Sequence, residues 1–210
     1  MLKGTAAKFT LIKHDAESAS SLPNSPLTAV CPDNNGNLLI ATMGTDKVGL
    51  CMMNLQSGNI KEFPLDKKLS GFIYQSMMVD SRNNLWIGTY NKGLLKVDLK
   101  GSGFVQYLFD DENHNSLPSN DIRSIFEDRD KTIWIGTTIG LAKIDAQNNV
   151  VTRCDIVENK TIGIRCIKQT NNGLLWLGTY GDGAITYNPA TDNVDLSPTN
   201  FNPRVVIDML

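Results

Sequence analysis

The chain has 210 residues, of which 41% are apolar and 20% charged, and its 20 basic and 22 acidic residues give a net charge of -2. This composition excludes a disordered or fibrous chain, and the lack of a basic excess argues against a protein that binds nucleic-acid phosphates. No apolar run approaches the roughly 18 residues that span a bilayer, and the first residues show no apolar core of a signal peptide.

A four-residue motif recurs along the chain and divides it into repeats. It reads Leu-Ile-Ala-Thr at residues 39–42, Trp-Ile-Gly-Thr at 86–89 and 134–137, and Trp-Leu-Gly-Thr at 176–179. Counted between the first residues of the copies, the spacings are 47, 48 and 42 residues. An acidic or hydroxyl residue also stands six positions before each copy. Such self-similarity is typical of repeat folds.

Each repeat is predicted to contain four short β-strands separated by tight turns. In the third repeat, residues 122–127 and 132–137 form strands around a turn at 128–131, and residues 141–144 form the next strand. Residues 104–108 represent the outer strand in the second repeat. Asn-Gly, Asn-Asn and Ser-Gly pairs between strands favour tight hairpins. No stretch shows a sustained helical apolar period, so almost no helix is expected.

Antiparallel units of this length predict an all-β fold made of four-stranded β-propeller blades. One blade cannot bury both of its faces, so the blades must stack around an axis. We place the blades approximately at residues 22–68, 69–116, 117–160 and 161–204. Residues 1–21 would supply a loop and, at Phe9–Ile12, the outer strand of a preceding blade, and residues 205–210 the first strand of a following one. The chain therefore holds about four to four and a half blades.

The repeated motif is interpreted as the core between blades. Alternation along the strand puts Trp86 and Gly88 on one face of the sheet, and Ile87 and Thr89 on the other. The indole supplies apolar area, and the glycine lets a neighbouring backbone approach closely. The predicted core residues of this kind are Trp86, Gly88, Trp134, Gly136, Trp176 and Gly178. Asp80, Asp98, Asp128 and Asp145 are predicted to cap the turns.

These motifs resemble the two-component regulator propeller repeats. The resemblance covers about residues 9 to 208 and rests on Leu85–Thr89, Gly93-Leu94, Asp98, Ser116–Pro118 and Glu127-Asp128. The first repeat departs from the pattern, with Leu39 for the tryptophan and Ala41 for the glycine. The fourth lacks the Ser-Leu-Pro loop.

The resemblance implies a role in sensing. Such repeats typically form the periplasmic sensor region of hybrid two-component histidine kinases in Gram-negative bacteria. Many of these kinases respond to polysaccharide breakdown products and switch on carbohydrate-utilisation genes. The resemblance therefore implies a periplasmic segment that recognises an oligosaccharide, with the kinase activity of the full-length protein lying outside these residues.

The sequence shows no pattern for catalysis or for a metal. His14 and His114 stand at non-equivalent loop positions, so neither completes a Ser-His-Asp or Cys-His set. The acidic run at 110–112 lacks the spacing of a calcium loop. Cys31, Cys51, Cys154 and Cys166 form no C-x-x-C pair and are interpreted as small buried residues. No cofactor, metal ligand or catalytic residue is therefore expected.

Loops on one face of the propeller are the candidate binding surface. The loops between blades, and those between the second and third strands, should gather there around the mouth of the channel. The candidate ligand-binding residues are Gln75, Tyr90, Asn91, Lys92, Asn120, Asp121, Arg123, Arg165, Tyr180 and Asp182. Gln75, Arg123 and Arg165 share one position, eleven residues before the motif. Tyrosine with planar arginine and amide groups suits sugars, acidic ones especially.

Two other functions stay open, and the length bears on one of them. The propeller could be a protein-interaction or dimerisation platform without a small ligand, or, ranked last, a propeller lyase, which would need a histidine in register.

Seven blades would need roughly 320 residues. We therefore expect a truncated chain or an open arc whose end blades self-associate. No nucleic acid and no membrane span is expected within the segment.

Overall fold

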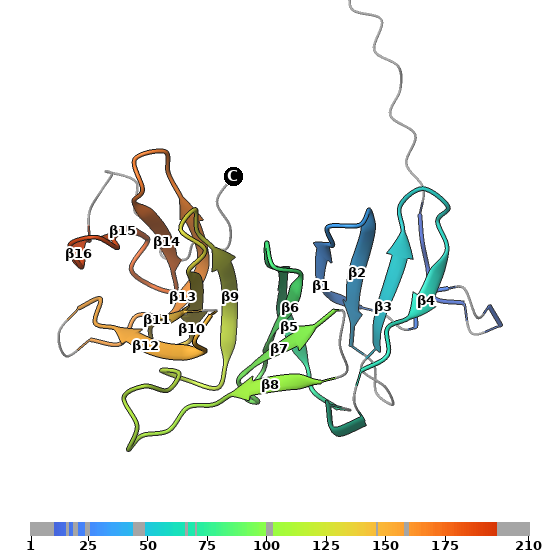
Figure 1. Ribbon diagram of the computed structural model, residues 1–210, viewed down its shortest axis with the longest axis horizontal. Coiled ribbons are helices and arrows are strands. Elements are labelled where there is room, and N and C mark those ends of the chain that lie inside the picture. The colour runs from blue at the N-terminus through green and yellow to red at the C-terminus, as the bar shows by residue number, and fades with distance from the viewer. Residues whose placement is uncertain are drawn as a thin grey trace, which may run out of the picture.

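A computed structural model describes residues 11–15, 17–18, 21–23, 26–43, 49–65, 67–69, 71–99, 103–145, 147–157 and 160–196 (Figure 1). These residues form four antiparallel four-stranded sheets and one short 3-10 helix, η1 (Lys67–Leu69). The predicted all-β architecture of about four propeller blades is confirmed. Within the described ranges, no helix is long and apolar enough to cross a membrane.

The strands of each sheet follow one another in chain order. The first blade contains β1 (Leu27–Pro32), β2 (Asn37–Thr42), β3 (Gly49–Asn54) and β4 (Ile60–Glu62). The second contains β5 (Tyr74–Val79), β6 (Asn84–Thr89), β7 (Leu94–Asp98) and β8 (Phe104–Tyr107). The third contains β9 (Ile122–Glu127), β10 (Ile133–Thr137), β11 (Leu141–Asp145) and β12 (Val150–Cys154), and the fourth β13 (Ile164–Gln169), β14 (Leu175–Thr179), β15 (Ala184–Asn188) and β16 (Asn193–Asp195).

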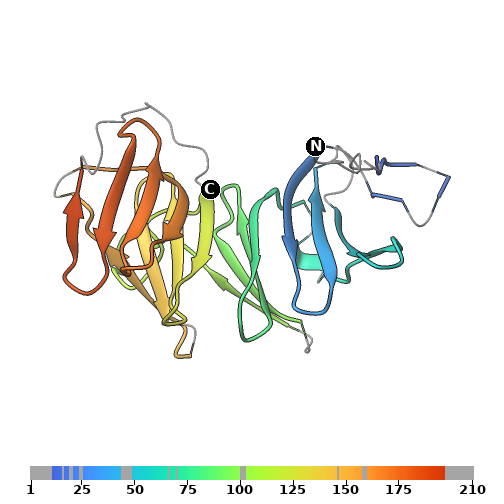
Figure 2. The ribbon, with the colours of Figure 1, turned by 90° about the horizontal axis from the view of Figure 1, so that it is seen from above.

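The blades stand side by side in an arc. The first strands contact one another from blade to blade, β1 with β5, β5 with β9, and β9 with β13. They are therefore the inner strands, and the fourth strand of each sheet is the outer one. Figure 2 shows the sheets succeeding one another from the N-terminal blade to the C-terminal blade.

The ends of the chain are only partly described. Residues 9 and 10 of the strand expected at 9–12, and the whole strand expected within 205–210, lie outside the described residues. Leu11 and Ile12 lie in irregular chain and are exposed.

The tryptophans of the second and third blades fill the space between neighbouring sheets. Trp86 is fully buried and packs with Ile122 and Ile135 of the third blade, and Trp134 packs in the same way against the fourth. Trp86 also stacks on Tyr107, with ring centroids 5.9 Å apart. Trp176, at the same position of the fourth blade, is half-buried.

A glycine two residues after each buried tryptophan brings the next blade into contact. A Cβ atom added to Gly136 would lie 2.2 Å from the Ser124 hydroxyl and 2.7 Å from the carbonyl oxygen of Ile164, in the next blade. Gly88 is equally crowded, by Ser76 and by Ile122 of the next blade. No side chain fits there without moving the neighbouring sheet.

One buried aspartate joins each of these tryptophans to its turn. Asp128 accepts hydrogen bonds from the backbone N–H groups of Asp130 and Thr132, both at 2.9 Å, and from the Trp134 indole N–H at 2.7 Å. Asp80 binds the Trp86 indole at 2.8 Å in the same way. In the first blade Asp33 binds the Asn37 side chain instead. There, burial opposes ionisation, but hydrogen bonds from Asn37 and Asn35 lower the pKa of Asp33 overall.

The four cysteines are free thiols. Cys31, Cys51 and Cys166 are buried, and Cys154 is half-buried. Burial, with the nearby Asp33 charge, raises the pKa of the Cys31 thiol to about 12. Burial raises the pKa of the Cys51 and Cys154 thiols to about 11.

We predict that Asp128→Ala lowers the free energy of unfolding by about 2 kcal/mol, because it leaves a buried indole N–H and two turn amides without an acceptor. Urea denaturation followed by tryptophan fluorescence measures the change. Asp130→Ala, in the same turn and exposed, is the control and should change the value by less than about 0.5 kcal/mol. Equal losses in the two variants would contradict the assigned role of Asp128.

We also predict that Gly136→Ala destabilises the protein by about 1–3 kcal/mol, because the methyl group must displace the backbone of the next blade. Gly103→Ala is the matched control, since a Cβ atom there meets nothing within 4 Å. Thermal unfolding of both variants by circular dichroism tests the difference. Tolerance of alanine at both positions would show that the two sheets are less closely packed than described.

Candidate functional site

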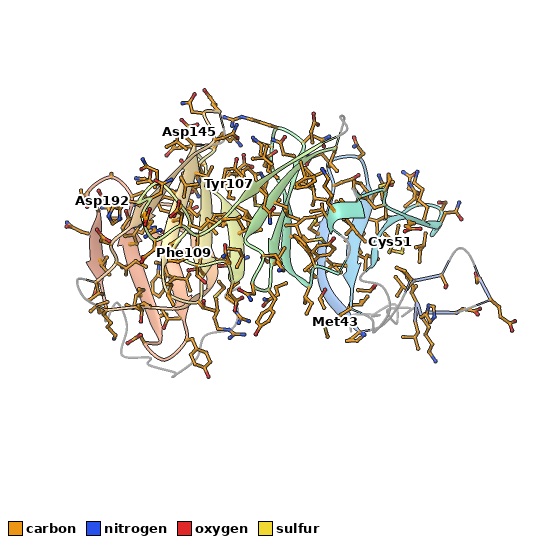
Figure 3. All side chains as sticks on the ribbon, turned by 90° about the horizontal axis from the view of Figure 1, so that it is seen from below. Met43, Cys51, Tyr107, Phe109, Asp145 and Asp192 are labelled. Carbon is orange, nitrogen blue, oxygen red and sulfur yellow. The ribbon has the colours of Figure 1, made fainter. Side chains whose placement is uncertain are left out.

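The sheets have two rims, and the candidate residues lie on one of them. The first, here called the loop rim, carries residues 90–93, 119–121, 138–140 and 180–183. The other, the turn rim, carries residues 80–83, 128–131, 145 and 147–149. Figure 3 shows the separation: Met43, which follows β2, and Asp145, which ends β11, lie at opposite edges.

Backbone hydrogen bonds build the loop rim in the same way in all four blades. The residue after each motif threonine donates its N–H to a carbonyl just before the inner strand. The pairs are Met43 to Pro26, Tyr90 to Ile73, Thr138 to Asp121 and Tyr180 to Gly163, at 2.9, 2.9, 3.2 and 2.9 Å. The motif threonines are fully buried. In blades two to four their hydroxyls donate to glycine carbonyls, Thr89 to Gly93, Thr137 to Gly140 and Thr179 to Gly183, at 2.6, 2.9 and 2.7 Å.

A β-bulge interrupts every inner strand at the same repeat position. The register between the inner strand and its neighbour shifts across Thr28, Gln75, Arg123 and Arg165. A bulge leaves one residue outside the ladder, bends the strand and redirects the side chain. This position carries threonine, glutamine, arginine and arginine in the four blades, whereas the register shift is the same in each. The four bulges thus present a row of variable side chains along the arc.

Three of the candidate residues form one network across two blades. The Arg123 guanidinium donates to the Gln75 side-chain oxygen at 2.8 Å and pairs with the Asp121 carboxylate at 2.7 Å. The Gln75 amide donates to the other Asp121 oxygen at 3.0 Å. The Arg123 and Asp121 side chains are 28% and 17% exposed, so this pair is only partly screened by water. The structure thus joins the bulge residues of the second and third blades.

In the fourth blade the bulge residue stands over an aromatic ring. The Arg165 guanidinium carbon lies 5.7 Å from the centre of the Tyr180 ring. Tyr180 is 65% exposed, so much of its side chain faces solvent. Asp182, two residues on, pairs with Lys160 from the crossover between the third and fourth blades.

The remaining candidates lie on turns and crossovers of the rim. Tyr90 is 52% exposed, and Lys92 is also exposed. Asn91 has a left-handed backbone with φ of 61°, which asparagine tolerates well. The Asn120 side-chain oxygen accepts from the Phe109 N–H at 2.8 Å, and its carbonyl accepts from the Gly93 N–H at 2.8 Å. Asn120 therefore holds a crossover in place.

Sequence reasoning missed four rim residues. Thr28 is the bulge residue of the first blade, and Met43 and Ile139 are exposed side chains of the second-to-third strand loops. Counting eleven residues back from Leu39 would have found Thr28. Lys160 lies in the crossover of the shortest repeat, whose different length removes the register needed to find it.

The rim offers polar side chains that can bind a ligand. Among the described residues, no group of three histidine, cysteine or acidic side chains could hold a metal ion. A pocket of about 120 Å³, lined partly by Ile139, Arg153, Lys160 and Ile162, lies between the third-blade loop and the next crossover. The bulge residues Gln75, Arg123 and Arg165 do not line it.

Comparisons with known proteins agree with this architecture. The family model for the two component regulator propeller matches residues 21–44, 68–91, 116–138 and 159–181. Each match covers the inner strand and the motif strand of one blade. Histidine kinase P4 of Formosa agariphila is 28% identical over 91 residues, which are 42% of this chain and 7% of that protein.

Solved structures from Bacteroides thetaiotaomicron share the fold. One is the extracellular domain of a protein assigned as a hybrid two component system, with a TM-score of 0.65 and 18% identity, over 83% of this chain and 25% of that one. Another extracellular domain with the same assignment gives a TM-score of 0.68 and 20% identity, over 85% of this chain and 23% of that one. The chain thus spans about a quarter of these domains.

We predict that a double-mutant cycle of Gln75→Ala and Arg123→Ala gives a coupling free energy of about 0.5–1 kcal/mol, because the two side chains share a hydrogen bond. The free energy of unfolding in urea is the measured quantity. The pair Gln75→Ala and Arg165→Ala is the control and should be additive. A Gln75–Arg123 coupling no larger than that of the control pair would contradict the cross-blade network.

Proposed function

This chain carries four two component regulator propeller repeats, and from that premise we propose that it is part of the extracytoplasmic, ligand-sensing region of a hybrid two component system. The extracellular domains that share its fold support the location. A periplasmic position is part of the proposal. The proposal also gives this segment a binding role instead of a catalytic one.

The observation that carries the proposal is the contrast between backbone and side chains on the loop rim. One equivalent backbone hydrogen bond holds the rim in each of the four blades. On that scaffold, the bulge positions carry threonine, glutamine and two arginines. Variable side chains on a rigid frame are typical of a binding surface.

An oligosaccharide is the ligand class that these groups fit best. Gln75 and Arg123 present an amide and a guanidinium to the rim, both able to bind hydroxyl groups. Tyr90 and Tyr180 are exposed aromatic side chains on the second-blade and fourth-blade loops of the same rim. Binding of a sugar across blades would be passed to a kinase elsewhere in the full-length protein and would regulate carbohydrate-utilisation genes.

A protein-interaction platform is the second candidate, because one apolar or aromatic side chain is exposed in each blade of the rim. The exposed fractions are 38% for Met43, 52% for Tyr90, 44% for Ile139 and 65% for Tyr180. Exposed apolar groups on one face are typical of contacts between proteins. Under this alternative, the rim would dimerise or bind a partner and would need no sugar.

Isothermal titration calorimetry of the chain against neutral and acidic oligosaccharides tests the proposal. We expect saturable binding for at least one sugar, and at least about a tenfold weaker affinity in the Gln75→Ala/Arg123→Ala double variant, because both groups would contact the sugar. Arg82→Gln, on the turn rim, is the control and should keep the affinity.

The two candidate functions give different results. Size-exclusion chromatography with light scattering, run on the same samples, reports the oligomeric state. A dimer that is lost on Tyr90→Ser/Tyr180→Ser substitution, with no heat from any sugar, would replace the sensing proposal with the platform. Equal sugar affinity in the double variant and the control would place the sugar away from the bulges.

A further inference from the structure

Some charged side chains of the loop rim have an oppositely charged partner, and one of the arginines has none among the described carboxylates. Asp121 pairs with Arg123 across a distance of 2.7 Å, and Asp182 pairs with Lys160. Within the part of the chain that the structure describes, these are the ion pairs formed by the rim's candidate carboxylates. No described carboxylate pairs with Arg165. Its charge is therefore the one left uncompensated among the bulge residues.

Arg123 and Arg165 occupy the same repeat position, but their guanidinium N–H groups have different partners. The Arg123 guanidinium already donates to Asp121 and to Gln75. The Arg165 guanidinium carbon stands over the Tyr180 ring, 5.7 Å from its centre, and among the described residues no carboxylate pairs with this guanidinium. The in-plane donors of Arg165 thus stay available, in the fork geometry that matches an oxyanion.

Hydrogen bonding and close packing hold the backbone of Tyr180. Its N–H donates to the Gly163 carbonyl at 2.9 Å. A Cβ atom on Gly163 would lie 2.8 Å from the Thr138 carbonyl oxygen, so the crossover runs tightly against the third blade. The backbone from which the Tyr180 side chain projects toward Arg165 is therefore held in place by the third blade and the crossover.

We infer that Arg165, supported by Tyr180, binds an oxyanion substituent, carboxylate or sulfate, of the saccharide, and so selects acidic over neutral sugars. This inference rests on the proposed function, because it assigns the charge selectivity of the same rim. Arg123 contributes to affinity but not to this selectivity, since Asp121 already neutralises it. Lys92 is an exposed cation on another blade and would add only a general attraction.

The test compares an acidic oligosaccharide with its uncharged ester and adds a sulfated oligosaccharide. Calorimetry is carried out with trigalacturonate, with its fully methyl-esterified form, and with a sulfated galacto-oligosaccharide. The chain should bind the carboxylate form at least about tenfold more tightly than the ester, because a charge-assisted bidentate contact is lost in the ester. Binding of the sulfated oligosaccharide shows whether the site takes a sulfate group as well as a carboxylate.

Three matched variants locate the effect. Arg165→Gln and Arg123→Gln both introduce the residue that the second blade carries at its bulge, so both should fold. Arg165→Gln should bring the acid-to-ester affinity ratio close to one, whereas Arg123→Gln should weaken both ligands and keep the ratio. Lys92→Gln reports the general effect of a surface cation. Equal loss of the ratio in all three variants would overturn the inference.

A direct readout does not depend on the oligosaccharide chosen. The arginine Nε–Hε signals in a nitrogen-15 NMR spectrum are titrated with glucuronate, and the Arg165 signal is identified by its loss in Arg165→Gln. We expect a saturable shift at Arg165 and a smaller one at Arg123. No shift at Arg165 overturns the inference. If neutral and acidic sugars bind equally well, the proposed function stands and the inference alone fails. If no oligosaccharide binds in calorimetry while glucuronate shifts the Arg165 signal, the oligosaccharide-sensing proposal fails and the oxyanion site stands.

Discussion

The hydrogen bond that a buried indole donates to a turn aspartate is the interaction on which the two middle blades depend. Asp128 accepts both from the turn amides and from Trp134, so one carboxylate fixes the hairpin and orients the largest side chain between two blades. A buried indole N–H without an acceptor would oppose stacking of the blades. The first blade, which carries Leu39 in place of the tryptophan, has no such donor to satisfy, and its Asp33 binds Asn37 instead.

This arrangement separates the tasks of the two rims. The turn rim carries the aspartates, and links such as the bond from the Arg129 N–H to Gln169 join one blade to the next there. Because these bonds on the turn rim hold the sheets together, the bulge positions of the loop rim can carry different side chains. The bulges supply those side chains without breaking the ladder on either side, as the regular pairing that resumes beyond each of them shows.

Much of the fold could be predicted from the sequence, because the repeat supplies the same information four times. The strand at 122–127 coincides with β9, and the strand at 132–137 begins one residue before β10. The site was harder to predict. A bulge is a matter of pairing register, which spacing along one strand does not reveal, so Gln75, Arg123 and Arg165 could be aligned but not oriented. The partners of the rim residues depend on loop conformation, which the sequence does not give. The crossover loop that brings Lys160 to Asp182 belongs to the shortest repeat, so no other repeat has a loop of equal length to compare with it.

The bulge has a consequence for how such a protein can change over evolutionary time. Its residue lies outside the ladder, and its neighbours in the strand keep their partners. Single-codon changes at that one position of a blade can therefore alter what the surface prefers while folding is left nearly intact. Duplication of a blade copies the scaffold and adds one more independently mutable position. A family built in this way could diversify its ligands much faster than its architecture.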